Sequence, residues 1–405
     1  MRSVPASTLV TLAVTMTFLA LTSCSGGNSG GSMNPGIPAA PGTQTMSSSA
    51  SSSAESAMSS SVDTDTLAGD VFTDDSVSIL KQLTSERTIG STIVDGQLNP
   101  YGLDIAKTTA GKVTKGDLVI CNFNNPQNIQ GTGTTLLRLH PVEGSRPLQI
   151  ANSPILTGCN ALATAPSGPI WNAAFSSNAN PIFSPAGQLL AELHGLPYDH
   201  PFGQAFSPKA GPFGVAAFYA SNARGDGAII RANILADKKF TFDRIATGFP
   251  INNGVPGSIL GPSGLQYDAR DDRLYIVDGT NNAVYALCHV TTIPRNGIHV
   301  NANGTTFSGP FAHRARLIFM GSPLNGPISS ALLFNGHLVI GNTLDAAGLN
   351  LMVEITPAGH VLDVKNVDNG AGGAIFGMVA SGTDVASTRL YFNDDNSNTN
   401  IVLKP

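Results

Sequence analysis

Polar and aromatic side chains recur at the two ends of short apolar segments, and they are the residues of this sequence best suited to bind a ligand. Each stands either at the start of one apolar segment or in the turn that follows the next apolar segment. The strongest candidates are Asn99, Tyr101, Asn160, His200, Phe202 and Asp278. Amides and aromatic rings suit contact with a sugar-like or peptide ligand better than they suit charge chemistry. The residue types therefore favour binding over catalysis.

Further residues share this placement. At the segment starts and in the turns they are Ser263, Asn325, Asn122, Asn124, Asn222, Asn342 and Asp394. Asn and Asp in turns often bond their own backbone. A purely structural role is therefore the alternative for each of them.

Two kinds of catalysis can be compared with these residues. A lactonase that uses a hard divalent ion would need a Glu and an Asp that converge on it with Asn side chains, since hard cations prefer charged oxygens. The segment starts offer no Glu, although Asp104 follows the first start. A lyase could use a His and a Glu placed as acid and base, but His200 has no Glu beside it. Residues 394–398 could bind Ca²⁺ weakly, but they lack the Gly and the distal Glu of a calcium-binding hand loop. We expect no cofactor.

The candidate residues are positioned by a unit that recurs six times. It begins with a Pro- or Gly-containing start, continues in a β-rich run that ends in Asn or Asp, and returns as another strand. The starts are residues 99–103, 158–162, 200–204, 261–265, 326–330 and 375–378. The second strands are expected at 118–122, 170–172, 217–222, 274–278, 338–342 and 390–394. The third strands are expected at 136–139, 188–190, 229–232, 284–287, 352–355 and 401–403.

Units of about 50 to 65 residues are typical of four-stranded propeller blades with long loops. The sequence therefore predicts an all-β fold, a six-bladed β-propeller. The last unit has only three strands, and because a ring must hide its edges, an N-terminal strand should complete it. Residues 77–80 and 91–94 are the two candidates. A seven-bladed ring and a β-sandwich are the alternatives. In a propeller, strand starts and second-strand turns share one face, so the candidate residues would meet at the mouth of the axial channel.

The fourth unit carries a family resemblance. Gly264-Leu265, Leu274-Tyr275-Ile276-Val277-Asp278 and the following Asn281-Asn282-Ala283-Val284 resemble an NHL repeat. Related six-bladed propellers include non-catalytic interaction modules, metal-dependent lactonases of the gluconolactonase and SMP-30 type, and a lyase of streptogramin antibiotics. The fold does not choose among these functions. We expect a binding scaffold of the cell envelope that uses the channel mouth, and the alternative is a lactonase-type hydrolase or lyase with its site in the channel.

The N-terminal residues indicate export. Arg2 precedes an apolar run, residues 7–21, that is shorter than a membrane-spanning helix requires. The run ends in Leu21-Thr22-Ser23-Cys24, which resembles the bacterial lipobox. The resemblance implies a lipoprotein signal peptide over residues 1–23, a lipid such as palmitate on Cys24, and attachment to a membrane, with the outer membrane favoured. Residues 24–70 are rich in Ser and Gly and predict a disordered tether, and residues 71–405 would form the propeller.

Composition and cysteines add two constraints. Charged residues make up 12% of the chain and the net charge is −5, so nucleic acid is a poor partner. We expect a monomer with an unknown protein or carbohydrate ligand. Cys121, Cys159 and Cys288 remain beyond Cys24, and an odd number leaves at least one free or paired between molecules. A bridge between Cys121 and Cys159 would join adjacent blades.

Overall fold

A computed structural model describes residues 76–209 and 214–405 of the chain. The chain divides into two units, residues 1–64 and 65–405, and all described residues belong to the second. The expected signal peptide, Cys24 and the expected tether lie outside the described residues. Within the described ranges, no helix has the length and apolar character needed to cross a membrane.

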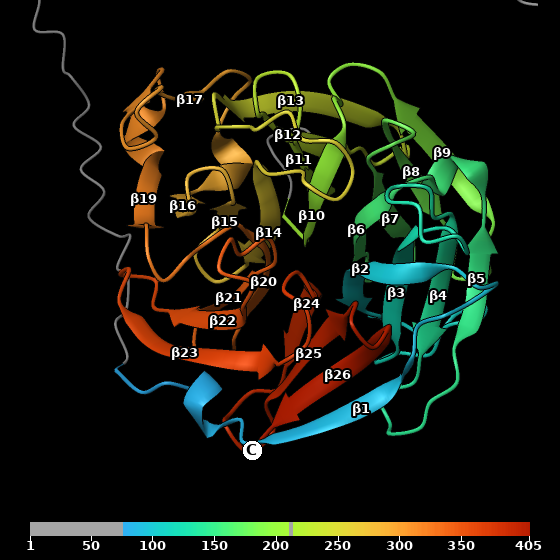
Figure 1. Cartoon of the computed structure of the whole chain (residues 1–405). Coiled ribbons are helices and arrows are strands. Elements are labelled where there is room, and N and C mark those ends of the chain that lie inside the picture. The colour runs from blue at the N-terminus through green and yellow to red at the C-terminus, as the bar shows by residue number, and fades with distance from the viewer. Residues whose placement is uncertain (1–75, 210–213) are drawn as a thin grey trace, which may run out of the picture. The chain divides into compact units, whose positions relative to one another are not determined.

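The described residues form six antiparallel sheets around a central axis (Figure 1). Blades 1 and 2 consist of β2 (Leu98–Ile105), β3 (Leu118–Asn124), β4 (Thr135–Leu139), β5 (Leu148–Asn152), β6 (Cys159–Thr164), β7 (Ile170–Ala174), β8 (Ala179–Phe183) and β9 (Leu189–His194). Blades 3 and 4 consist of β10 (Pro201–Ser207), β11 (Ala216–Asn222), β12 (Ile229–Ile234), β13 (Phe240–Thr247), β14 (Pro262–Asp268), β15 (Arg273–Asp278), β16 (Ala283–Leu287) and β19 (Ala315–Met320). Blades 5 and 6 consist of β20 (Pro327–Leu332), β21 (Leu338–Asn342), β22 (Asn350–Ile355), β23 (Val361–Asp368), β24 (Ile375–Ser381), β25 (Arg389–Asp394), β26 (Thr399–Lys404) and β1 (Ser85–Ser91). The six-bladed propeller is confirmed.

The first strand of each blade lies nearest the axis, where neighbouring backbones come very close. A Cβ atom on Gly203 would lie 1.7 Å from the Ser263 carbonyl oxygen of the next blade. A Cβ atom on Gly377 would lie 2.2 Å from the Tyr101 carbonyl oxygen. Only glycine leaves room for this approach, which explains the glycine in the starts of blades 1, 3, 4 and 6.

The ring is closed by an N-terminal strand, as expected, but not by either segment proposed from the sequence. β1 pairs antiparallel with β26, from Ser85 opposite Lys404 to Ser91 opposite Thr399. Residues 77–80 instead lead into the short 3-10 helix η1 (Leu80–Gln82), and of residues 91–94 only Ser91 belongs to β1. The reason is that Ile79 and Leu80 are buried in an apolar cluster formed with residues of blades 5 and 6. Their apolar character reflects that packing and not a strand.

The third strand of blade 2 also differs from its expected position. Residues 188–190 begin the outer strand β9, and the third strand is β8. β8 contains Pro181, which lacks an N–H group, and proline usually avoids central strands. The Asn172 side-chain amide donates to the Pro181 carbonyl oxygen at 3.1 Å and replaces part of the missing ladder. The other five third strands are where the repeats predict them.

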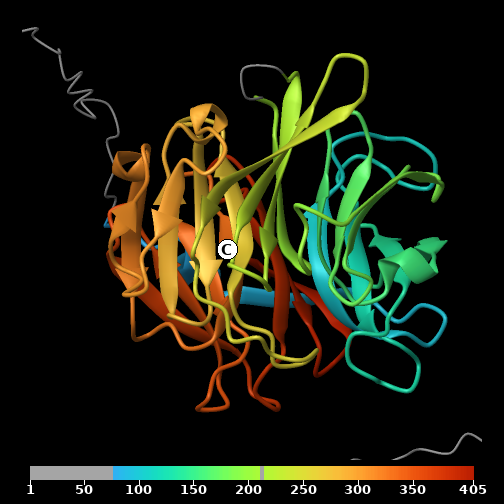
Figure 2. The same ribbon diagram turned by 90° about the horizontal axis from the view of Figure 1, so that it is seen from above.

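Blades 3 and 4 are joined by an insertion. Between β16 and β19 the chain forms η3 (Val290–Thr292), β17 (Ile298–Val300), β18 (Phe307–Ser308) and η4 (Ala312–Arg314). β17 pairs parallel with β13, so blade 3 becomes a six-stranded sheet. In Figure 2, blade 3 (yellow-green) lies between blade 2 (green) and blade 4 (yellow to orange). η2 (Pro154–Leu156) connects blades 1 and 2.

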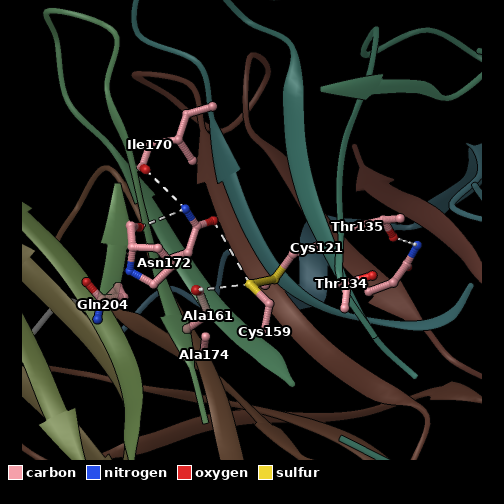
Figure 3. Close-up of a disulfide and its surroundings, with 12 residues drawn as sticks. Cys121, Thr134, Thr135, Cys159, Ala161, Ile170, Asn172, Ala174 and Gln204 are labelled. Atoms are coloured by element: carbon pink, nitrogen blue, oxygen red, sulfur yellow. Dashed lines mark hydrogen bonds between the residues drawn. A yellow bond between two sulfur atoms is a disulfide. The ribbon is translucent and has the colours of Figure 1, made fainter. Parts of the chain in front are cut away.

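A disulfide between Cys121 of β3 and Cys159 of β6 joins blades 1 and 2 (Figure 3). The Cα atoms are 6.0 Å apart, and the bridge closes a loop of 38 residues. The third cysteine, Cys288, is buried after β16. The bridge that the sequence allowed between adjacent blades is therefore present.

Candidate functional site

The end of the channel at which the inner strands begin is filled by apolar side chains. We call this cluster the aromatic plug, and it consists of Tyr101, Phe123, Phe175, Phe202, Ile328 and Phe376. The Tyr101 ring stacks on Phe123 with a centroid distance of 4.2 Å and on Phe376 at 3.7 Å. Since residues from five blades supply the plug, this end of the channel, which we call the closed end, is not the amide-lined mouth that the sequence suggested.

Two loops meet over the closed end. A Cβ atom on Gly131, in the loop after β3, would lie 2.7 Å from Pro256 Cβ, in the loop before β14. A Cβ atom on Gly257 would lie 3.2 Å from Gln130 Cγ. These contacts cover the plug on its outer side.

Beneath the plug lies an axial cavity of about 70 Å³, lined by the inner strands of all six blades. Its polar side chains are uncharged, and they are Asn160, Gln204, Ser263, Gln266, Ser329 and Ser330. The side-chain Nδ2 and Oδ1 atoms of Asn160 have no hydrogen-bond partner among the described residues. The same holds for Gln204 Oε1 and Ser330 Oγ. Buried polar atoms without partners are costly, so this cavity is suited to ordered water or to polar groups of a ligand.

The channel opens where the inner strands finish, and we call this the open end. A cavity of about 250 Å³ lies there. It shares Gln204 and Gln266 with the axial cavity, so the two lie next to each other. A third cavity, of about 200 Å³, adjoins it at Leu332 and Ala380. The channel is therefore a pit that is closed by the plug at one end and accessible at the other.

The lining of the open end mixes polar and apolar side chains. Its polar residues come from blades 1 to 4, and they are Asp104, Lys107, Thr164, Gln204, Gln266 and Tyr267. Apolar residues come from all six blades, and blades 5 and 6 contribute only apolar ones, Leu332, Met378, Val379 and Ala380. Such a mixed surface suits a ligand that has both hydroxyl groups and an apolar face, as a sugar ring does.

Asp104 is the one carboxylate in this lining, and its oxygens are already engaged. Oδ1 accepts from the Ile105 backbone N–H at 2.7 Å and from Lys107 Nζ at 2.9 Å. Oδ2 accepts from the backbone N–H and the hydroxyl of Thr164 at 2.7 and 2.8 Å. Asp104 therefore fastens blade 1 to blade 2.

The structure brings together three of the six residues singled out from the sequence. Tyr101, Asn160 and Phe202 line the axial cavity, and the two rings belong to the plug. Asn99 and His200 have positive φ angles of 59° and 53° and hold the turns before β2 and β10. Their backbone N–H groups donate to Asn398 Oδ1 at 2.7 Å and to Asn178 Oδ1 at 2.6 Å, respectively.

The His200 ring lies against the plug and does not line the axial cavity. Its Nδ1 lies 2.8 Å from Asp199 Oδ1, and the ring centroid is 4.9 Å from that of Phe175. Asp278 is buried at the end of β15, where Oδ1 accepts from the backbone N–H groups of Thr280 and Asn281. Burial raises the pKa of Asp278 to about 7.

The remaining turn residues bond nearby chain segments. Asn122, Asn222 and Asn342 donate through Nδ2 to the carbonyl oxygens of Thr92, Pro197 and Pro323, respectively, at distances of 3.0, 2.9 and 2.8 Å. Each bond ties the end of a second strand to the connection that enters the same blade. In residues 394–398, Asp394 Oδ1 accepts from the Asn396 backbone N–H at 3.0 Å. Across the described ranges, no group of three or more His, Cys, Asp or Glu side chains is placed to hold a metal ion.

The sequence interpretation missed Gln204, Gln266 and Thr164. Side chains alternate along a strand, so the residues two positions apart from Phe202 and Asn160 point to the same axis. Following the series Phe202–Gln204–Phe206 and Asn160–Leu162–Thr164 would have led from the closed end to the open one.

Comparison with known proteins identifies the fold. The sequence matches no known protein-family profile and no curated protein. A calcium-binding protein, regucalcin, from Agrobacterium tumefaciens is 16% identical, with a TM-score of 0.50 over 78% of this chain and 95% of that one. Virginiamycin B lyase from Staphylococcus aureus is 14% identical, with a TM-score of 0.47 over 79% of this chain and 99% of that one. A chain of a nidogen/laminin complex is 14% identical, with a TM-score of 0.49 over 70% of this chain and 86% of that one. At these identities the likeness is one of fold alone.

Proposed function

We propose that this chain is a membrane-anchored binding protein of the cell envelope that takes a neutral, hydroxyl-rich ligand into the open end of its propeller. The observation that carries the proposal is the pit itself, in which an accessible cavity adjoins an axial cavity lined by uncharged amides and hydroxyls. Such a lining offers donors and acceptors without a net charge, which is what a saccharide requires.

The polar residues of the open end come only from blades 1 to 4, and this would orient such a ligand. The amides of Gln204 and Gln266 would bond its hydroxyl groups. Met378 and the neighbouring apolar residues of blade 6 would cover its C–H face. The plug beneath sets the depth to which the ligand can enter.

Binding is better supported than hydrolysis or elimination. The side chains assigned to the axial cavity are amides, hydroxyls and apolar groups. Proton transfer in catalysis needs a positioned acid or base, and Asp104 at the open end already accepts four hydrogen bonds.

The binding proposal can be tested by saturation-transfer NMR on the full chain with maltotriose and with tri-N-acetylchitotriose as probes. We expect signal transfer to at least one of them, and we expect Gln266→Leu and Gln204→Leu each to weaken it by about tenfold through loss of a buried hydrogen bond. Gln127→Leu, an exposed glutamine in the loop after β3, is the matched control. Absence of transfer to both sugars, or equal transfer to all variants, would contradict the proposal.

The membrane anchor needs its own experiment, because Cys24 lies outside the described residues. The residues that support it are Leu21-Thr22-Ser23-Cys24. We expect cells grown with labelled palmitate to incorporate the label into the protein, and the protein to sediment with membranes. Cys24→Ser should remove the label. A label that persists in this variant would exclude Cys24 as the lipid site.

A further inference from the structure

A second cavity lies far out on blade 3, away from the axis. It has a volume of about 700 Å³ and is enclosed by β12, β13 and the turn between them on one side and by the segment after η3 on the other. Ligand pockets usually have volumes of about 300 to 1,000 Å³. The cavity is therefore large enough for a few amino-acid residues.

The floor of this cavity is a set of four polar side chains on one face of blade 3. Arg231 lies opposite Asp243, and Asn233 lies opposite Thr241, in the register of β12 and β13. Arg231 is only 3% exposed and pairs with Asp243 at 2.8 Å. It also donates to the carbonyl oxygens of Val290 and Thr291. The charges of Arg231 and Asp243 offset each other, and the floor is neutral.

Asn233 leaves one buried acceptor unused. Its Nδ2 donates to Asp243 Oδ2 at 2.9 Å and to Thr241 Oγ1 at 3.3 Å. Its Oδ1 has no hydrogen-bond partner in the part of the chain that the structure describes, although the residue is only 5% exposed. A buried acceptor in this state costs about 1 to 3 kcal/mol. It therefore favours a ligand that brings an N–H or O–H group.

The rim supplies one uncompensated positive charge. Asp237 pairs with Lys239 at 2.8 Å. Arg295 is exposed, and within residues 76–209 and 214–405 it forms no ion pair. Leu235 and Pro294 add an apolar wall. A matching ligand carries one negative charge, one hydrogen-bond donor and an apolar group.

We propose that this cavity binds the carboxyl-terminal residues of a peptide whose last side chain is apolar. The terminal carboxylate pairs with Arg295, a backbone N–H donates to Asn233 Oδ1, and the last side chain packs against Leu235 and Pro294. Capture of a free carboxyl terminus is an established mode of peptide recognition. This site is separate from the axial pit and does not depend on the function proposed for it.

The test uses the full chain and two peptides that differ only at the carboxyl end. Isothermal titration with acetyl-Ala-Ala-Leu and with acetyl-Ala-Ala-Leu-amide should show about fivefold tighter binding of the acid, the effect expected of one exposed ion pair. Equal affinities, or no heat with either peptide at millimolar concentration, would overturn the proposal.

Four variants test whether the peptides bind in this cavity. Arg295→Gln should reduce the affinity for the acid to that for the amide, while Asn233→Ala should weaken both peptides by a similar factor. Arg146→Gln changes an exposed arginine beside β5 in the same way and should have no effect. Gln266→Leu should also leave peptide binding unchanged. If Gln266→Leu abolished it, or if Arg295→Gln kept the preference for the acid, the site would be wrong.

Discussion

Ser78 Oγ donates a 2.6 Å hydrogen bond to Glu354 Oε2, although the two residues are 276 positions apart. The buried carboxylate also accepts from the backbone N–H groups of Ile79 and Leu80, and its Oε1 lies 2.8 Å from His337 Nδ1. The segment before β1 is thereby fixed to β22 of blade 5 before it reaches blade 6. Lys365 Nζ strengthens this attachment by donating to the Leu80 carbonyl oxygen at 2.9 Å.

Replacing this carboxylate should weaken the closed ring. Glu354→Gln keeps the size of the side chain but places an NH₂ group against backbone donors, so we expect the free energy of unfolding to fall by roughly 2 to 4 kcal/mol. Urea unfolding at pH 7 measures it. Glu143→Gln, at an exposed glutamate, is the control. Equal midpoints for Glu354→Gln and the unchanged protein would show that the contact does not stabilise the fold.

The hydrogen bonds to Glu354 should also make the free energy of unfolding depend on pH. Burial acts to raise the pKa of Glu354, but hydrogen bonds from His337, Ser78 and the backbone outweigh it and hold the pKa below its ordinary value of 4.5. A carboxyl whose folded pKa is lowered stabilises the protein above its unfolded pKa and loses this effect as the pH falls through the folded value. The stability difference between the unchanged protein and Glu354→Gln should therefore shrink between pH 6 and pH 3.

The contribution of Asp278 to stability should change with pH in the opposite direction. Its folded pKa of about 7 lies above the ordinary value of 3.8. The stability that it contributes is complete below about pH 4 and is lost as the pH rises through about 7. Asp278→Asn keeps an acceptor for Thr280 and Asn281 but buries no charge, so it should exceed the unchanged protein in stability at pH 8, by roughly 3 kcal/mol.

Urea unfolding at pH 4 and pH 8 measures this effect, and Asp237→Asn at an exposed turn is the control. A gain at pH 8 that persists undiminished at pH 4 would mean that ionisation of Asp278 is not the cause.

The disulfide should stabilise the contact of blades 1 and 2. Closing a 38-residue loop is expected to contribute about 3 to 4 kcal/mol. We expect the double change Cys121→Ser and Cys159→Ser to lower the unfolding free energy by that amount. Mass spectrometry of a non-reduced digest should show the peptides of Cys121 and Cys159 linked, and a digest in which they are separate would contradict the bridge.

The plug should be a large source of stability. Tyr101 is buried between Phe123 and Phe376, and removing a large buried aromatic side chain costs about 3 to 5 kcal/mol. Tyr101→Ala should show this loss in thermal and urea unfolding, whereas Tyr101→Phe keeps the stacking and should lose less than half as much. If both variants lost the same amount, the hydroxyl group and not the stacked ring would be the source.

The number of blades could be predicted because the backbone geometry at certain positions selects particular residue types. Glycine near the axis marks blades 1, 3, 4 and 6, and proline at the strand start marks blades 1, 3, 4 and 5. Asn or Asp ends the second strand in every blade except blade 2, and the inner and second strands of all six units lie where the repeats predict them. Local preference does not favour a strand at β8, which contains Pro181, and it does not distinguish η1 from a strand, because Ile79 and Leu80 are apolar. Both differences arise where tertiary contacts override local preference.

Which end of the channel is accessible could not be predicted in the same way. The plug depends on Tyr101 meeting Phe376, residues from the first and last blades, and no local pattern encodes that contact. Asn160 was singled out for its residue type and does line the axial cavity. Predicting that Gln204 and Gln266 line the channel requires the strand directions in three dimensions. Ligand binding by all of these residues stays a prediction.

Pairing β1 with β26 also dictates the order in which the molecule can be completed. Ser85 to Ser91 leave the ribosome about 300 residues before Thr399 to Lys404, the partners that they need. Until then, β1 lacks its partner strand, and the open ring exposes strand edges that can pair with other chains. Closure of so long a loop makes the final step slow. A nascent chain of this protein therefore depends on protection from aggregation until its last strand is available.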